Sequence, residues 1–88
     1  MITKLQIEEI EKRLAHATPG KWVSYIEGRD HTCGSDFIMT GVGGKRGPDI
    51  ELTGATKADQ DFIANARQDI ELLISALKES GCLEKNEA

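Results

Sequence analysis

The residues with the clearest chemical character lie in a glycine-rich basic loop, Gly41 to Gly47, with the sequence GVGGKRG. Glycines let consecutive backbone N–H groups converge on one anion, which predicts a phosphate cradle on Gly43 and Gly44. Lys45 and Arg46 add two cations, and the arginine fork suits two oxygens of one phosphate. No serine or threonine follows the lysine, so the pattern is not that of nucleotide hydrolases. A flexible hairpin with solvated charges is the competing interpretation.

Two side chains elsewhere could complete such a site. Trp22 is the only tryptophan and could stack on a ligand, although a lid over a small core is the stronger interpretation. Arg67 lies beside the apolar stripe of a predicted helix, where its guanidinium can reach the sheet, another subunit or a ligand; a structural ion pair is the alternative. We therefore expect a ligand site formed in an oligomer by Trp22, Gly43, Gly44, Lys45, Arg46 and Arg67.

Metal binding and catalysis find little support. Structural zinc needs four ligands, whereas the chain has two histidines and two cysteines without paired spacing, among them His31 and Cys33. We expect Cys33 and Cys82 to be free thiols in a reducing compartment. No serine, cysteine or lysine has a base and an orienting group in the pattern of covalent catalysis. The chain is therefore predicted to be no enzyme and to carry no metal or cofactor.

Length and charge narrow the class of protein. Eighty-eight residues form one domain with a thin stability margin, which self-association would widen. Fifteen acidic and 11 basic residues give a net charge of −4, which argues against general nucleic-acid binding. No apolar run approaches the roughly 20 residues of a membrane span, and the N-terminal sequence does not resemble a signal peptide. These patterns predict a cytoplasmic protein that does not enter membranes.

Helical periodicity marks both ends of the chain. Residues 1–17 contain a helix that begins at Thr3, whose spacing to Gln6 matches a capping box. Residues 56–80 form the main helix, with the same kind of start at Thr56 and a stop at Gly81. Apolar residues on one stripe of this helix predict the main core contact: Phe62, Ile63, Ala66, Ile70, Leu73, Ile74 and Leu77.

The middle of the chain, residues 21–53, reads as a β-meander. Alternating or β-branched segments predict strands at 21–27, 36–42 and 48–53. The predicted fold is a single α+β domain over residues 1–88: a helix, a three-stranded antiparallel meander and a helix, with both helices packed on one face of the sheet. The last residues, 83–88, are expected to be a frayed tail.

Two segments resemble a known family. Thr18-Pro-Gly-Lys-Trp22 follows the first helix, and Ala58-Asp-Gln-Asp-Phe-Ile-Ala64 opens the last. These motifs are similar to those of the Ead-like early proteins of phages and related short phage and actinobacterial proteins. The chain departs from the family at Lys21, commonly proline there, and at Glu71, where a proline often sits; the second departure favours one unbroken helix. The resemblance implies a phage or prophage accessory protein, and it transfers no catalytic residues.

Three functions fit a small acidic protein of this kind. The first is counter-defence by a homo-oligomer, a dimer or larger, that sequesters a phosphorylated small molecule such as a nucleotide immune signal, without turnover. The second is masking of a host or defence protein, with the acidic first helix as the contact surface. DNA binding ranks third, because the basic residues are scattered. The sequence does not identify the ligand, the host target or the number of subunits.

Overall fold

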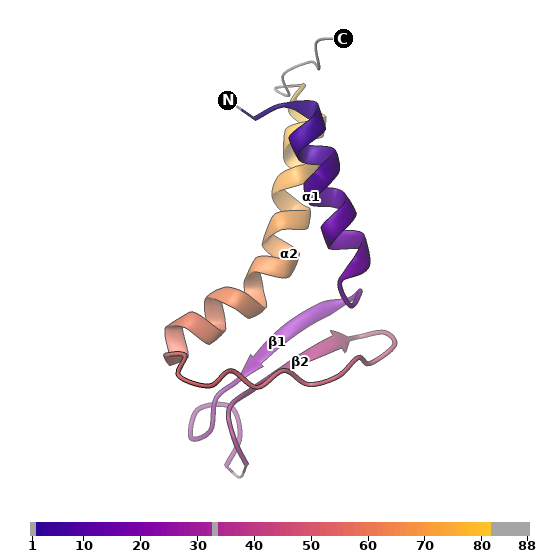
Figure 1. Cartoon of the computed structure of the whole chain (residues 1–88). Coiled ribbons are helices and arrows are strands. Elements are labelled where there is room, and N and C mark those ends of the chain that lie inside the picture. Colours follow the sequence, from indigo (N-terminus) through magenta and orange to yellow (C-terminus); the bar gives the residue numbers. More distant parts are fainter. Residues whose placement is uncertain (1, 33, 82–88) are drawn as a thin grey trace.

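The computed structural model describes residues 2–32 and 34–81. Two helices and a two-stranded antiparallel sheet follow one another along the chain as α1 (Lys4–His16), β1 (Lys21–Tyr25), β2 (Phe37–Val42) and α2 (Lys57–Ser80). α1 runs along the C-terminal half of α2, while the N-terminal half of α2 passes over the β-hairpin (Figure 1). The α+β class is confirmed, and α2 continues unbroken through Glu71 as its sequence predicts. The predicted tail, 83–88, and both cysteines lie outside the described residues.

Both helices begin at the predicted residues. The Thr3 side chain accepts a hydrogen bond from the Gln6 backbone N–H, and the Gln6 side chain accepts one from the Thr3 N–H. Thr56 and Asp59 form the same reciprocal pair at the start of α2. These side chains satisfy N–H groups that no helical carbonyl reaches. At the other end of α2, Gly81 adopts φ 70°, the left-handed conformation that glycine tolerates best.

The sheet differs from the predicted meander in its third segment. Of residues 48–53, only Ile50 pairs with β2, through two backbone hydrogen bonds to Ile38. Pro48 has no N–H to donate, and its carbonyl accepts a hydrogen bond from the Thr40 hydroxyl at 2.7 Å. The Thr40 carbonyl in turn accepts from the Arg46 side chain. Side-chain bonds therefore replace a strand ladder here. The described sheet has the two paired strands β1 and β2, and Ile50 is attached to β2 through an isolated bridge.

An irregular step in the sheet lies beside Trp22. Lys21 pairs with Val42 and Val23 with Met39, so β2 contains one more residue than β1 over this interval. Gly41 supplies the step with φ 68°, and a Cβ at this position would collide with the Lys45 carbonyl. The ladder is interrupted opposite Trp22.

The packing of α2 corrects the predicted core. The buried residues of α2 are Gln60, Ala64 and Ile74, and only Ile74 belongs to the predicted apolar stripe. Phe62, by contrast, is 75 % exposed and Leu73 is 62 % exposed. At 100° per residue, the row Gln60, Ala64 and Gln68 that faces the sheet is turned by roughly 140° from the centre of the stripe.

Two glutamines explain why this face is the one that docks. The Gln60 side-chain amide lies near three acceptors, the Ser24 hydroxyl and the Tyr25 and Phe37 carbonyls, at 2.8, 3.2 and 3.1 Å. The Gln68 amide accepts from the Trp22 N–H and donates to the Trp22 carbonyl. The Gln68 side chain therefore satisfies the backbone groups of Trp22, as a neighbouring strand would, where the ladder is interrupted. Buried backbone groups that find such partners avoid a large desolvation cost.

α1 also departs from the predicted arrangement. It packs against α2, and within the described residues it contacts neither strand. Ile7 of α1 and Ile74 of α2 are buried between the helices, and Lys78 pairs with Glu11 at 2.6 Å. Among the described residues, only α2 covers the sheet. The sheet therefore does not extend under α1, and one side of the α1–α2 pair is left without another element against it.

Candidate functional site

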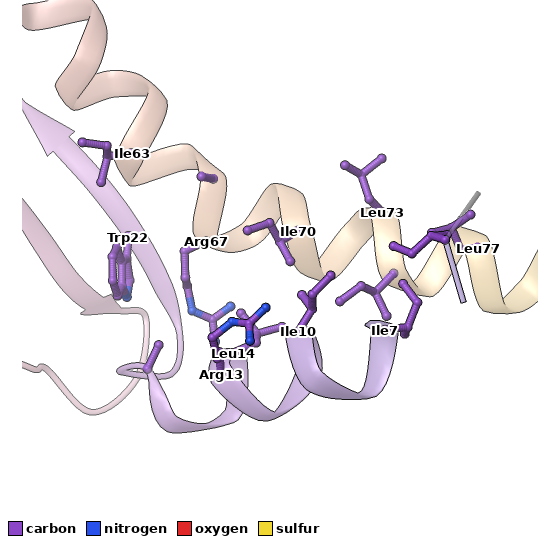
Figure 2. A pocket seen from close by; sticks show the side chains of 14 residues that line it. Ile7, Ile10, Arg13, Leu14, Trp22, Ile63, Arg67, Ile70, Leu73 and Leu77 are labelled. Carbon is purple, nitrogen blue, oxygen red and sulfur yellow. The ribbon is translucent and has the colours of Figure 1, made fainter. Parts of the chain in front are cut away.

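The uncovered side of the helix pair forms an apolar groove of about 580 Å³. Its floor and walls come from both helices, with Trp22 at one end (Figure 2). A volume of this size is typical of sites for small molecules. The groove contains five residues of the predicted stripe that do not reach the core. The residues that line it are Ile2, Ile7, Ile10, Arg13, Leu14, Ala17, Trp22, Ile63, Ala66, Arg67, Ile70, Leu73, Ile74 and Leu77.

The basic end of the groove consists of Arg13, Trp22 and Arg67. Arg13 comes from the last turns of α1 and Arg67 from the middle of α2, and both side chains reach the same end of the groove near Trp22 (Figure 2). They are the only charged residues of the lining among the described residues. Two guanidinium groups at one end of an apolar groove favour an anionic guest, because both can donate charge-assisted hydrogen bonds to its oxygens.

Arg67 is held firmly in this position. Its side chain is 9 % exposed, its Nε donates to the Thr18 carbonyl at 3.2 Å, and its Nη1 lies 3.4 Å from the Glu71 carboxylate. The Trp22 indole N–H donates to the same Thr18 carbonyl at 3.0 Å. The Thr-Pro-Gly turn thus orients both residues, with no need for a ligand to order them.

Arg13 differs, because it makes no side-chain hydrogen bond or ion pair to another described residue. It is exposed, so water hydrates its guanidinium in the free protein. Sequence reasoning missed this residue. The available signal was its place directly before Leu14 and three residues after Ile10, at the edge of the apolar face of α1.

The glycine-rich loop lies apart from the groove. Arg46 pairs with Asp49 at 2.7 Å and also donates to the Thr40 carbonyl. The Gly44 N–H donates to the Gly41 carbonyl, and the Gly47 N–H donates to the Thr40 carbonyl. Lys45 is exposed and has no partner among the described residues. The structure therefore brings Trp22 and Arg67 together, and it places Gly43, Gly44, Lys45 and Arg46 outside the groove lining.

A second charged cluster lies outside the groove lining, where the segment after β1 meets the first turns of α2. Arg29 makes a two-bond pair with Asp61 at 2.8 and 3.0 Å and also bonds Asp30 at 2.9 Å. The hydrogen bond from Arg29, with a smaller contribution from Ser24, lowers the pKa of Asp61 to about 2. Arg29 likewise lowers the pKa of Asp30. One guanidinium thus bonds two carboxylates, and its pair with Asp61 fastens the segment after β1 to α2.

Other site classes are absent from the described residues. No group of three or more histidine, cysteine, aspartate or glutamate side chains is placed to hold a metal within residues 2–32 and 34–81. In the same part of the chain, neither helix combines the length and apolarity of a membrane span.

Comparisons with known proteins add no assignment. No family model, no curated protein and no solved structure matches this chain. The site is therefore interpreted from its own geometry.

Proposed function

We propose that this chain is a non-catalytic phage or prophage accessory protein that binds and sequesters a phosphorylated small molecule, such as a nucleotide immune signal, in the cytoplasm of the host. The resemblance to Ead-like early proteins gives this proposal its biological setting. The observation that carries it is the convergence of Arg13 and Arg67 beside Trp22 at the basic end of the groove.

The three residues divide two roles between them in this proposal. Arg13 and Arg67 bind phosphate oxygens through charge-assisted hydrogen bonds. The indole of Trp22 offers an aromatic surface for a base, since base–aromatic stacking contributes about 1–3 kcal/mol. Arg67 is already ordered by Thr18 and Glu71, which reduces the entropy lost on binding. No nucleophile or general base accompanies these residues in the groove lining, so the proposal involves capture and no bond cleavage.

Calorimetric titration with cyclic and linear nucleotides tests this proposal and locates the site. Arg13→Gln removes one charge-assisted hydrogen bond, and we expect an affinity loss of about tenfold to a hundredfold, from roughly 1.5–3 kcal/mol. Lys45→Gln is the matched control, since it removes another exposed cation, from the glycine-rich loop. The reverse pattern would move the site to that loop. If the wild-type protein gives no heat of binding with any nucleotide of the panel, sequestration of nucleotides is refuted.

The apolar lining favours a second candidate, the masking of a host or defence protein. Grooves between two helices accept the apolar face of a third helix. In that case, Leu73→Glu would abolish capture of a purified target, while Leu72→Glu, on the same helix but outside the groove lining, would retain it.

A further inference from the structure

The half of the groove away from Trp22 is an apolar surface that the single chain leaves open. Ile70, Leu73 and Leu77 of α2 line it opposite Ile7 and Ile10 of α1 (Figure 2). Both Leu73 and Ile70 line the groove, yet their side chains remain in contact with water: Leu73 is 62 % exposed and Ile70 is 39 % exposed. No charged side chain lines this half, because both arginines of the lining belong to the basic end.

The open surface is large for a chain of this length. The whole chain exposes 6329 Å², whereas about 5,100 Å² is expected for a folded monomer of 9.6 kDa. One partner in a standard interface contributes about 800 Å², which is less than the difference. The total covers residues outside the described ranges as well, so the exposed leucine and isoleucine side chains of the groove are the evidence for an uncovered surface, and the area gives only its scale.

The composition of this surface indicates a second copy of the chain as its occupant. Transient partners usually meet surfaces that mix polar and apolar groups, whereas permanent homodimer interfaces are more apolar and resemble a divided core. The same face carries both the groove and the 62 % exposed side chain of Leu73. A twofold axis can place Leu73 of each copy against the groove of the other.

We infer that two copies pair in antiparallel fashion through the C-terminal halves of their α2 helices, with Leu73 near the twofold axis. The two α1 helices complete a four-helix arrangement around the buried isoleucines and leucines. Arg67 lies six residues before Leu73 on α2, about 9 Å along the helix at 1.5 Å per residue, so each basic end lies at the margin of the paired surface. This inference needs no ligand, so it goes beyond the proposed sequestration and is independent of it.

Sedimentation velocity of the full chain over a wide concentration range tests the pairing. We expect a dimer for the wild type, and a dissociation constant raised about a hundredfold or more by Leu73→Glu, because a charge then enters an apolar interface in both copies. Leu72→Glu is the matched control: Leu72 is 69 % exposed on the same helix but does not line the groove. Its dissociation constant should match that of the wild type within about threefold.

Three results would overturn the inference. They are a wild-type monomer at every concentration, equal weakening by the two variants, and a particle larger than a dimer. Far-ultraviolet circular dichroism of both variants verifies that α2 remains helical. The assays also separate this inference from the proposed function, since Leu73→Glu changes the mass and Arg13→Gln changes the heat of nucleotide binding.

Discussion

Replacing Gln60 by methionine tests how α2 is held against the sheet. Methionine has a similar length and suits a buried site, since Gln60 is only 3 % exposed. The substitution removes the amide group that approaches the Ser24 hydroxyl and the carbonyls of Tyr25 and Phe37. It leaves the apolar stripe of α2 unchanged, so any loss of stability reports on the glutamine contacts.

The expected cost follows from these contacts. Each lost hydrogen bond costs about 0.5–1.5 kcal/mol, and a buried carbonyl left without a partner costs about 1–3 kcal/mol. Because the methionine side chain regains some apolar burial, we expect a net loss of about 2–4 kcal/mol. A small domain has a total stability near the lower end of about 5–15 kcal/mol. The variant should therefore be close to unfolding at room temperature.

Urea unfolding followed by circular dichroism measures this effect. With a slope near 1 kcal/mol per molar urea, the midpoint should fall by about 2–4 M. Gln68→Met, which removes two bonds to Trp22 at a partly exposed position, should cost about half as much, by the same values per bond. Leu73→Ala, measured where the chain is monomeric, should cost less than about 1 kcal/mol because the side chain is mostly in water. A neutral Gln60→Met together with a loss of several kcal/mol for Leu73→Ala would refute the proposed docking.

Three further predictions concern the rest of the fold. Gly41→Ala should cost more than about 2 kcal/mol in urea unfolding, because the positive φ and the crowded position both oppose a Cβ; an unchanged midpoint would contradict the irregular step in β2. Thr56→Ala should cost about 1 kcal/mol through loss of the helix cap, while Thr56→Asn should retain stability in the same assay, and equal losses would argue against capping. The pKa of Asp61 is lowered to about 2, so its pair with Arg29 stabilises the fold above the ordinary carboxylate pKa, and this contribution is lost as pH falls through about 4 to 2. Asp61→Asn should therefore flatten the plot of unfolding free energy against pH in that window. A plot parallel to that of the wild type would exclude the pair with Arg29.

The sequence predicts the helices of this protein well and their packing poorly. Both capping boxes are local, so four residues suffice to specify each one. The choice of face on α2 is not local, because Gln60 docks only once Tyr25 and Phe37 present free carbonyls. A row of glutamine and alanine at a spacing of four looks like a solvent-facing row when the sheet is unknown. The sequence pattern therefore predicts that the apolar stripe forms the core contact, whereas the structure leaves most of the stripe in the groove.

The candidate site shows the same division between local and distant information. Trp22 and Arg67 were both identified, and their meeting at the Thr18 carbonyl depends on the Thr-Pro-Gly turn. Arg13 was not identified, since only the antiparallel packing of α1 on α2 brings it beside Arg67. The loop from Gly43 to Arg46 has the composition of a phosphate cradle, but part of its hydrogen-bonding capacity is used within the loop and its neighbours.

A nuclear Overhauser spectrum of the dilute protein tests most directly whether α2 faces the sheet with its glutamines and leaves its apolar stripe to the groove. We expect cross-peaks from the Gln60 side-chain amide protons to protons of Tyr25 and Phe37, and none from the Phe62 ring to β1 or β2. Cross-peaks from the Phe62 ring to the sheet, with none from the Gln60 amide, would contradict it.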